Sequence, residues 1–174
     1  IILNGRILEG DNGAAGELGH MVIHQNGHPC TCGRKGCLEA YASATALVSR
    51  AREAMERSDE SMLWSLCKGD LSGVNGRMIF EASEKGDSTA CEVLDGFMED
   101  LSEGIANIIN ILQPEILCIG GGLSGAGEAL LAPVKEKTAP KIYSRASQKN
   151  TRIRLAEMGN GAGIIGAACL NEQR

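Results

Sequence analysis

The sequence predicts an α/β fold in which helices cover a sheet. Near the end of the chain, an apolar segment at 116–119 leads through glycines into a helical pattern at 127–138. A second strand candidate at 153–156 leads through residues 159–163 into another helical pattern at 164–170. Repeated units of strand, glycine turn and helix are typical of such sheets. A long helical pattern at 87–112 supports the same class, with apolar residues recurring every three or four positions.

The remaining elements follow from local patterns. The chain opens with a hairpin pattern, because residues 1–3 and 7–9 flank the turn Asn4-Gly5. We therefore interpret the chain as the continuation of a longer polypeptide. Residues 21–23 are a short strand candidate, and residues 25–36 form an irregular loop that a bound metal would help to hold. Helical periodicity predicts helices at 38–57, 61–67 and 75–85, and Pro114 ends the long helix.

Composition narrows the choice of partners. The chain has 174 residues, a length suited to one domain, with 17 basic and 22 acidic residues and a net charge of −5. Scattered cations and few aromatic residues do not favour nucleic acid, and no apolar run is long enough for a membrane helix. Four dispersed cysteines lie in apolar or helical patterns, where buried free thiols are common: Cys67, Cys91, Cys118 and Cys169. This usage indicates a reducing cytoplasm.

The other three cysteines lie close to a histidine and form a candidate metal site. His20, Cys30, Cys32 and Cys37 together offer the nitrogen and sulfur donors of a tetrahedral zinc ion. His24 and His28 are alternative nitrogen donors, and spacing alone does not choose between them. A zinc knot that only staples the loop, or unrelated surface thiols, would fit the same residues. A DNA-binding finger is not favoured, because paired Cys-x2-Cys spacing is absent and only Arg34 and Lys35 are basic in this stretch.

Two glutamates flank this cluster. Glu17 precedes His20, and Glu39 follows Cys37 near the start of a predicted helix. A metal that joins Cys37 to His20 would bring both carboxylates toward one place, where they could accept hydrogen bonds from a polyhydroxylated ligand. The alternative is that Glu39 is a solvated residue that favours the helix dipole.

The run GAAGELGHMVIHQNGHPCTCGRKGCLEAYASA closely resembles the signature of the ROK family, which comprises bacterial sugar kinases and sugar-responsive repressors. The segments IGGGLS and GNGAGIIGAA resemble later parts of the same family, so the resemblance covers essentially the whole chain. It implies a ribonuclease-H-like lobe of the actin and hexokinase type, with a loop braced by zinc. It also implies that His20, Cys30, Cys32 and Cys37 bind zinc, and that Glu17, His20 and Glu39 bind the sugar. The resemblance therefore favours His20 over His28.

Two glycine turns match the dinucleotide pattern G-x-G-x-x-G, at 120–125 and at 161–166. A nicotinamide site is not favoured, because no acidic residue follows on a second strand at the expected distance. The family resemblance places Gly121 and Gly122 beside the adenosine of ATP. For the turn at 161–166 we expect a structural role, in which glycines let a strand and a helix approach closely.

The resemblance implies that residues 1–174 are the C-terminal lobe of a two-lobed sugar kinase that uses ATP and Mg²⁺. Glucose is the first candidate substrate, with glucose 6-phosphate as the product. The phosphate loops and catalytic aspartate of the family are not in this chain, so no catalytic residue is assigned and the chain alone should be inactive. The alternative is the sugar-binding lobe of a repressor. Family resemblance also favours a homodimer, and the 87–112 helix, apolar on more than one side, would be buried or would meet a second subunit.

Overall fold

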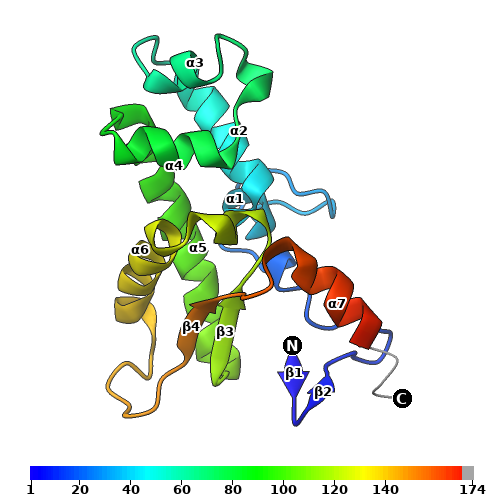
Figure 1. The fold of residues 1–174 in the computed structure, drawn as a ribbon. Helices are drawn as coiled ribbons and strands as arrows, with labels where there is room; N and C mark the ends of the chain where they lie inside the picture. Colours follow the sequence, from blue (N-terminus) through cyan, green and yellow to red (C-terminus); the bar gives the residue numbers. More distant parts are fainter. Residues whose placement is uncertain (170–174) are drawn as a thin grey trace.

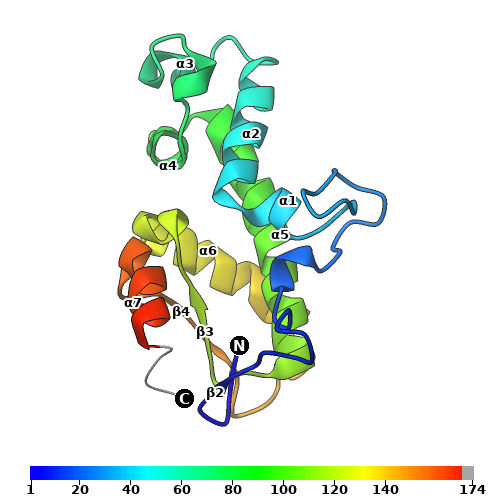
Figure 2. The same cartoon turned by 90° about the vertical axis from the view of Figure 1, so that its right-hand side faces the viewer.

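The computed structural model describes residues 1–169, which form an elongated molecule built along one long helix, α5 (Ser88–Leu112). Helices α2 (Ala44–Met55), α3 (Met62–Leu66) and α4 (Gly76–Glu84) surround one end of α5, as Figure 1 shows. Helix α6 (Glu128–Thr138) and the strands β3 (Ile116–Ile119) and β4 (Arg152–Leu155) lie at the other end. Figure 2 shows the same division from the side, with the N-terminal hairpin at the sheet end.

The limits of α5 follow from its sequence. The carboxylate of Asp87 caps the helix by accepting a hydrogen bond of 2.7 Å from the backbone N–H of Ala90. Gln113 ends it in the left-handed conformation, with φ of 41°, and Pro114 follows. The helix predicted at 87–112 is confirmed.

The hydrophobic core extends along α5, against which α2, α4 and α6 pack. Large side chains from all four helices are completely buried there, among them Leu47, Met55, Ile79, Phe97 and Leu130. Helices of the same chain therefore cover α5 on several sides. This accounts for most of its broad apolar surface, although Ile111 near its end is 74% exposed.

The helix predicted at 38–57 is wrong in one respect, because the chain forms two helices there. Helix α1 (Glu39–Ala42) ends at Ser43, whose φ of −87° and ψ of 163° are extended. The Ser43 hydroxyl oxygen then caps α2 by accepting a hydrogen bond of 3.1 Å from Ala46 N–H. The apolar spacing runs across the break almost in phase, so periodicity alone did not reveal it.

Strands β3 and β4 are parallel neighbours, with Ile116 opposite Arg152 and Ile119 opposite Leu155. Helix α6 and the short 3-10 helix η4 (Ala139–Lys141) lie between the two strands in the sequence. The predicted unit of strand, glycine turn and helix is therefore present, with β4 starting one residue earlier than predicted.

After β4, the 3-10 helix η5 (Gly159–Gly161) leads into α7 (Ala162–Cys169), so this unit is also present. Leu170, the last residue of the predicted closing helix, lies outside the described residues. Added Cβ atoms at Gly161, Gly163 and Gly166 would meet nothing within 4 Å. The expectation that these glycines allow close packing is therefore wrong within this chain.

The N-terminal hairpin is confirmed. Strands β1 (Ile2–Leu3) and β2 (Arg6–Ile7) are antiparallel, and both turn residues have positive φ, 53° at Asn4 and 77° at Gly5. The strand predicted at 21–23 is reduced to a single bridge between Val22 and Cys37. In the part of the chain that the structure describes, no helix combines the length and apolarity that crossing a membrane requires.

Candidate metal centre and ligand site

The structure brings the four predicted donors together. His20 ends the 3-10 helix η1 (Leu18–His20), Cys30 and Cys32 lie in the following loop, and Cys37 lies two residues before the start of α1. One donor atom from each residue lies within 4.8 Å of all the others. We call these four residues the donor cluster.

The donor cluster fits a tetrahedral zinc ion. The sulfurs of Cys32 and Cys37 are 3.7 Å apart, and the sulfur of Cys30 is 3.6 Å from Nδ1 of His20. Zinc–sulfur bonds of about 2.3 Å in a tetrahedron place two sulfur ligands about 3.8 Å apart. One imidazole and three sulfurs also match the donor types that zinc prefers.

Backbone hydrogen bonds shape the loop that carries the donors. Leu38 N–H donates to the carbonyl of Met21 at 2.8 Å, which holds Cys37 beside residues 21–23. Farther along, Cys30 N–H donates to the carbonyl of Arg34 at 2.8 Å, closing a tight turn in which Gly33 has φ of 87°. These bonds direct the cysteines toward a common point.

The other two histidines serve different purposes. His24 Nε2 lies 2.6 Å from a carboxylate oxygen of Asp100, a residue of α5 that is only 8% exposed. The backbone N–H of His28 donates a hydrogen bond of 2.6 Å to the hydroxyl of Tyr41. Neither histidine belongs to the donor cluster. Of the three histidines, geometry therefore groups only His20 with the three cysteines.

Tyr41 and Asp100 hold the loop by contacts that do not involve the donor cluster. The Tyr41 ring packs against those of His24 and His28, with ring centroids 4.5 Å and 4.9 Å away. Asp100 also forms an ion pair with Arg50 of α2, whose guanidinium lies over the Tyr41 ring. The loop that a bound metal would help to hold is therefore also held by these contacts. The sequence does not reveal these contacts, because Tyr41 lies on the apolar face of a predicted helix and Asp100 is far along the chain.

The protein environment shifts two of the thiols in opposite directions. A hydrogen bond from the backbone N–H of Cys32 is the main cause that lowers the pKa of Cys30 to about 7. Burial raises the pKa of Cys37 to about 11, and the neighbouring sulfurs add to the rise. A coordinated thiol is deprotonated. A cation among these sulfurs would therefore be required to keep the buried Cys37 as a thiolate at neutral pH.

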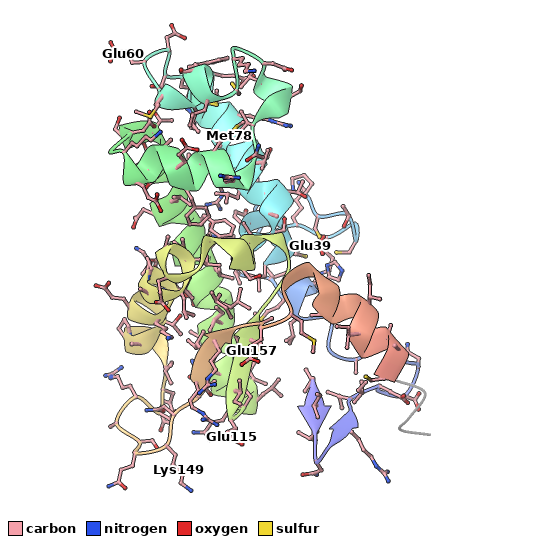
Figure 3. All side chains as sticks on the ribbon, viewed as in Figure 1. Glu39, Glu60, Met78, Glu115, Lys149 and Glu157 are labelled. Atoms are coloured by element: carbon pink, nitrogen blue, oxygen red, sulfur yellow. The ribbon has the colours of Figure 1, made fainter. Side chains whose placement is uncertain are left out.

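Glu39 lies beside the donor cluster. It is the first residue of α1, and its side chain is exposed, as Figure 3 shows. Its Oε1 accepts a hydrogen bond of 3.2 Å from the hydroxyl of Thr31. Its Oε2 would lie 3.6 Å from a Cβ atom added at Gly19, next to His20. The carboxylate thus reaches the segment that carries the histidine donor.

The expected sugar-binding residues line two hollows rather than one. Glu39 borders a hollow of about 660 Å³ together with Thr31, Cys30 and residues of α2. Glu17 and His20 border another of about 450 Å³, beside the end of α5. The expectation that a metal draws both glutamates to one place is therefore not met by these hollows: Glu17 shares one with His20, and Glu39 borders the other.

The first glycine turn also borders a hollow. Gly121 has φ of 77°, and Gly122 begins the 3-10 helix η3 (Gly122–Ala126). This helix and α4 enclose about 680 Å³, and the α4 side includes Asn75, Arg77 and Phe80. Gly122 lines the hollow, whereas Gly121 does not. The contribution of α4 was missed from the sequence because its residues lie far from the glycine motif and carry no motif of their own.

Comparisons with known proteins agree with this architecture. The chain is 41% identical over 176 residues to a glucokinase of Halalkalibacterium halodurans, covering 100% of this chain and 52% of that protein. It is 34% identical over 164 residues to the N-acetylglucosamine repressor of Escherichia coli, covering 94% of this chain and 39% of the repressor. The crystal structure of a ROK family glucokinase from Streptomyces griseus with glucose and AMPPNP has a TM-score of 0.91 and 31% identity, covering 100% of this chain and 56% of that one.

The chain therefore spans about half the length of the glucokinases that it matches. The sequence model of the ROK family matches residues 1–174. The helices, the parallel strands and the donor cluster together give the fold of ROK sugar kinases, which is of the actin and hexokinase type. This chain belongs to the ROK family.

Proposed function

We propose that residues 1–174 form the C-terminal lobe of a two-lobed kinase that transfers a phosphoryl group from ATP to a hexose, with glucose as the first candidate. The observation that carries the proposal is the donor cluster with the Glu39 carboxylate beside it. Similarity to glucokinases, one of which was crystallised with glucose and an ATP analogue, supports the reaction and the substrate class. We also propose that the protein acts in the cytoplasm, as a homodimer.

Each group in the site has a role in this proposal. Zinc held by His20, Cys30, Cys32 and Cys37 braces the loop, and the free Nε2 of His20 donates a hydrogen bond to a sugar hydroxyl. The carboxylates of Glu17 and Glu39 accept hydrogen bonds from other hydroxyls, so an analogue that lacks them would leave these acceptors unpaired. Because the two glutamates border separate hollows here, the second lobe would complete the sugar pocket between them.

The nucleotide would occupy the hollow between η3 and α4. Gly121 and Gly122 have no side chains to obstruct the adenosine, and Phe80 offers an apolar surface for the base. Phosphoryl transfer also requires Mg²⁺, groups that hold the phosphates and a base for the attacking hydroxyl. We assign the base and the phosphate loops to the other lobe.

The first prediction is that this chain alone has no kinase activity, because it lacks a base and phosphate-binding loops. A coupled assay for ADP release with glucose, ATP and Mg²⁺ should show no turnover above background, whereas the complete protein should be active. Turnover by residues 1–174 alone would contradict the assignment of the base to the other lobe.

The second prediction tests the sugar contact. Replacing Glu39 by Gln in the complete protein should weaken glucose binding by about tenfold to a hundredfold, since a charged hydrogen-bond acceptor is lost. Zinc content should stay the same, because Glu39 is not a donor. Calorimetry and metal analysis measure the two quantities.

Glu53→Gln is the matched control, because Glu53 borders the same hollow from α2 and has no proposed sugar contact. It should leave affinity unchanged. Equal loss of zinc in Glu39→Gln would show a structural role for Glu39 instead.

A repressor is the second candidate function, and the similarity to the N-acetylglucosamine repressor favours it. The lobe would then bind a sugar as an effector, without catalysis. A winged helix-turn-helix preceding this chain would identify the repressor, and a phosphate loop with a catalytic aspartate would identify the kinase.

A further inference from the structure

Thr31 connects the donor cluster to the carboxylate of Glu39. It stands between Cys30 and Cys32, so two neighbouring donors fix its backbone position. Its hydroxyl donates to Oε1 of Glu39 at 3.2 Å, and the sulfur of Cys30 is farther away, at 4.0 Å. Within residues 1–169, no other side chain donates a hydrogen bond to Glu39.

This bond determines which oxygen of Glu39 is free. An exposed glutamate samples several rotamers, and ordering it on ligand binding costs conformational entropy. With Oε1 occupied by the Thr31 hydroxyl, Oε2 is left beside Gly19, the residue that precedes His20 in the sequence. The free oxygen therefore faces the segment whose imidazole is the other proposed sugar contact.

We propose that Thr31 is a positioning residue that aims Glu39 at the sugar and transmits the state of the metal loop to it. This inference rests on the proposed sugar-binding role of Glu39. Loss of the metal would free the backbone of residues 30–32, and the hydroxyl would no longer hold Oε1. Thr31 would thus be one route by which a bound zinc ion raises sugar affinity without touching the sugar.

The test compares Thr31→Val, which keeps the side-chain shape but removes the hydroxyl, with Thr31→Ser, which keeps the hydroxyl. In the complete protein, Thr31→Val should weaken glucose binding on the order of fivefold, since one hydrogen bond to a charged group is lost. Thr31→Ser should bind within about twofold of the original protein, because the hydroxyl can still donate. Zinc content should remain unchanged in both variants.

A double-mutant cycle separates positioning from direct contact. In a Glu39→Ala background, Thr31→Val should cause no further loss of affinity, because the group that it positions is gone. A further loss of the same size would show that Thr31 acts independently of Glu39 and would overturn the proposal. Loss of zinc from Thr31→Val would also overturn it, because the residue would then stabilise the metal site itself.

Different results would contradict the proposed function and this inference. If Glu39→Ala leaves glucose affinity unchanged, the sugar-binding role of Glu39 is wrong and the inference fails with it. If Glu39→Ala weakens binding but Thr31→Val does not, the sugar site stands and only the role of Thr31 is wrong.

Discussion

Replacing Gly36 by alanine is expected to abolish metal binding while the helical core stays folded. Gly36 has φ of 82°, and a Cβ atom there would lie 1.7 Å from the backbone carbonyl oxygen of His24. The carbonyl of Gly36 also accepts a hydrogen bond of 2.9 Å from Ile23, and its N–H donates to His28 at 2.8 Å. Because backbone surrounds the position, the loop would have to move, and Cys37 would move with it.

The expected cost combines backbone strain with this clash. Together they should destabilise the folded loop by about 3 kcal/mol or more, which is enough to displace one ligand from the donor cluster. Zinc content should fall well below one ion per chain. The far-ultraviolet circular dichroism should change little, because α2, α4 and α5 form the core away from the loop.

Gly33→Ala is the matched control. Gly33 has φ of 87°, but a Cβ atom there would meet nothing within 4 Å. Only backbone strain applies, at about 1 kcal/mol, and zinc should be retained. If the two variants lost zinc equally, strain rather than the clash at Gly36 would be the cause, and the packing argument would be wrong.

Removal of zinc by a chelator is expected to abolish glucose binding by the complete protein, lowering affinity about a hundredfold or more. The metal replaces repulsion among three closely spaced sulfurs with bonds, and without it Thr31 and Glu39 lose their fixed positions. Calorimetry before and after chelation measures the loss. Re-addition of zinc should restore binding, which controls for irreversible damage.

The same treatment should loosen only part of the loop. The sequence predicts that a bound metal helps to hold residues 25–36, and the structure divides this segment into two parts. Residues 29–36 should exchange amide hydrogens faster without zinc, whereas the His28 amide should stay protected by its bond to Tyr41. Uniform exchange across the loop would show that the Tyr41 and Asp100 contacts do not hold it independently.

Sugar binding that survives complete metal loss would leave the donor cluster without a functional role.

The helices and strands could be predicted where a local signal marks both the element and its end. Asp87 and Pro114 bracket α5, and glycines follow each of the parallel strands. The three cysteine donors could also be predicted from their spacing, whereas the preference for His20 over His24 and His28 came from the family resemblance. The break at Ser43 was missed because an N-cap serine inside a continuous apolar pattern is a weaker signal than the pattern itself.

The rest depends on contacts between distant parts of the chain. The pairing of His24 with Asp100 spans 76 positions, and an acidic residue in a helix is normally solvated. The hollow at η3 likewise depends on how α4 packs. Separation of Glu17 and Glu39 into two hollows is set by the path of the chain around η1, which no residue pattern records.

Helix α5 also sets the distance between the proposed sugar site and the proposed nucleotide site. Asp100 in its middle holds the loop that carries the sugar-side residues, and its end at Leu112 leads through Pro114 into β3 and the glycine turn. With a rise of about 1.5 Å per residue, the helix sets roughly 18 Å of axial distance between these two attachments. A single residue inserted between them would turn everything beyond it by about 100° and misalign sugar and nucleotide together, although neither site would have lost an atom.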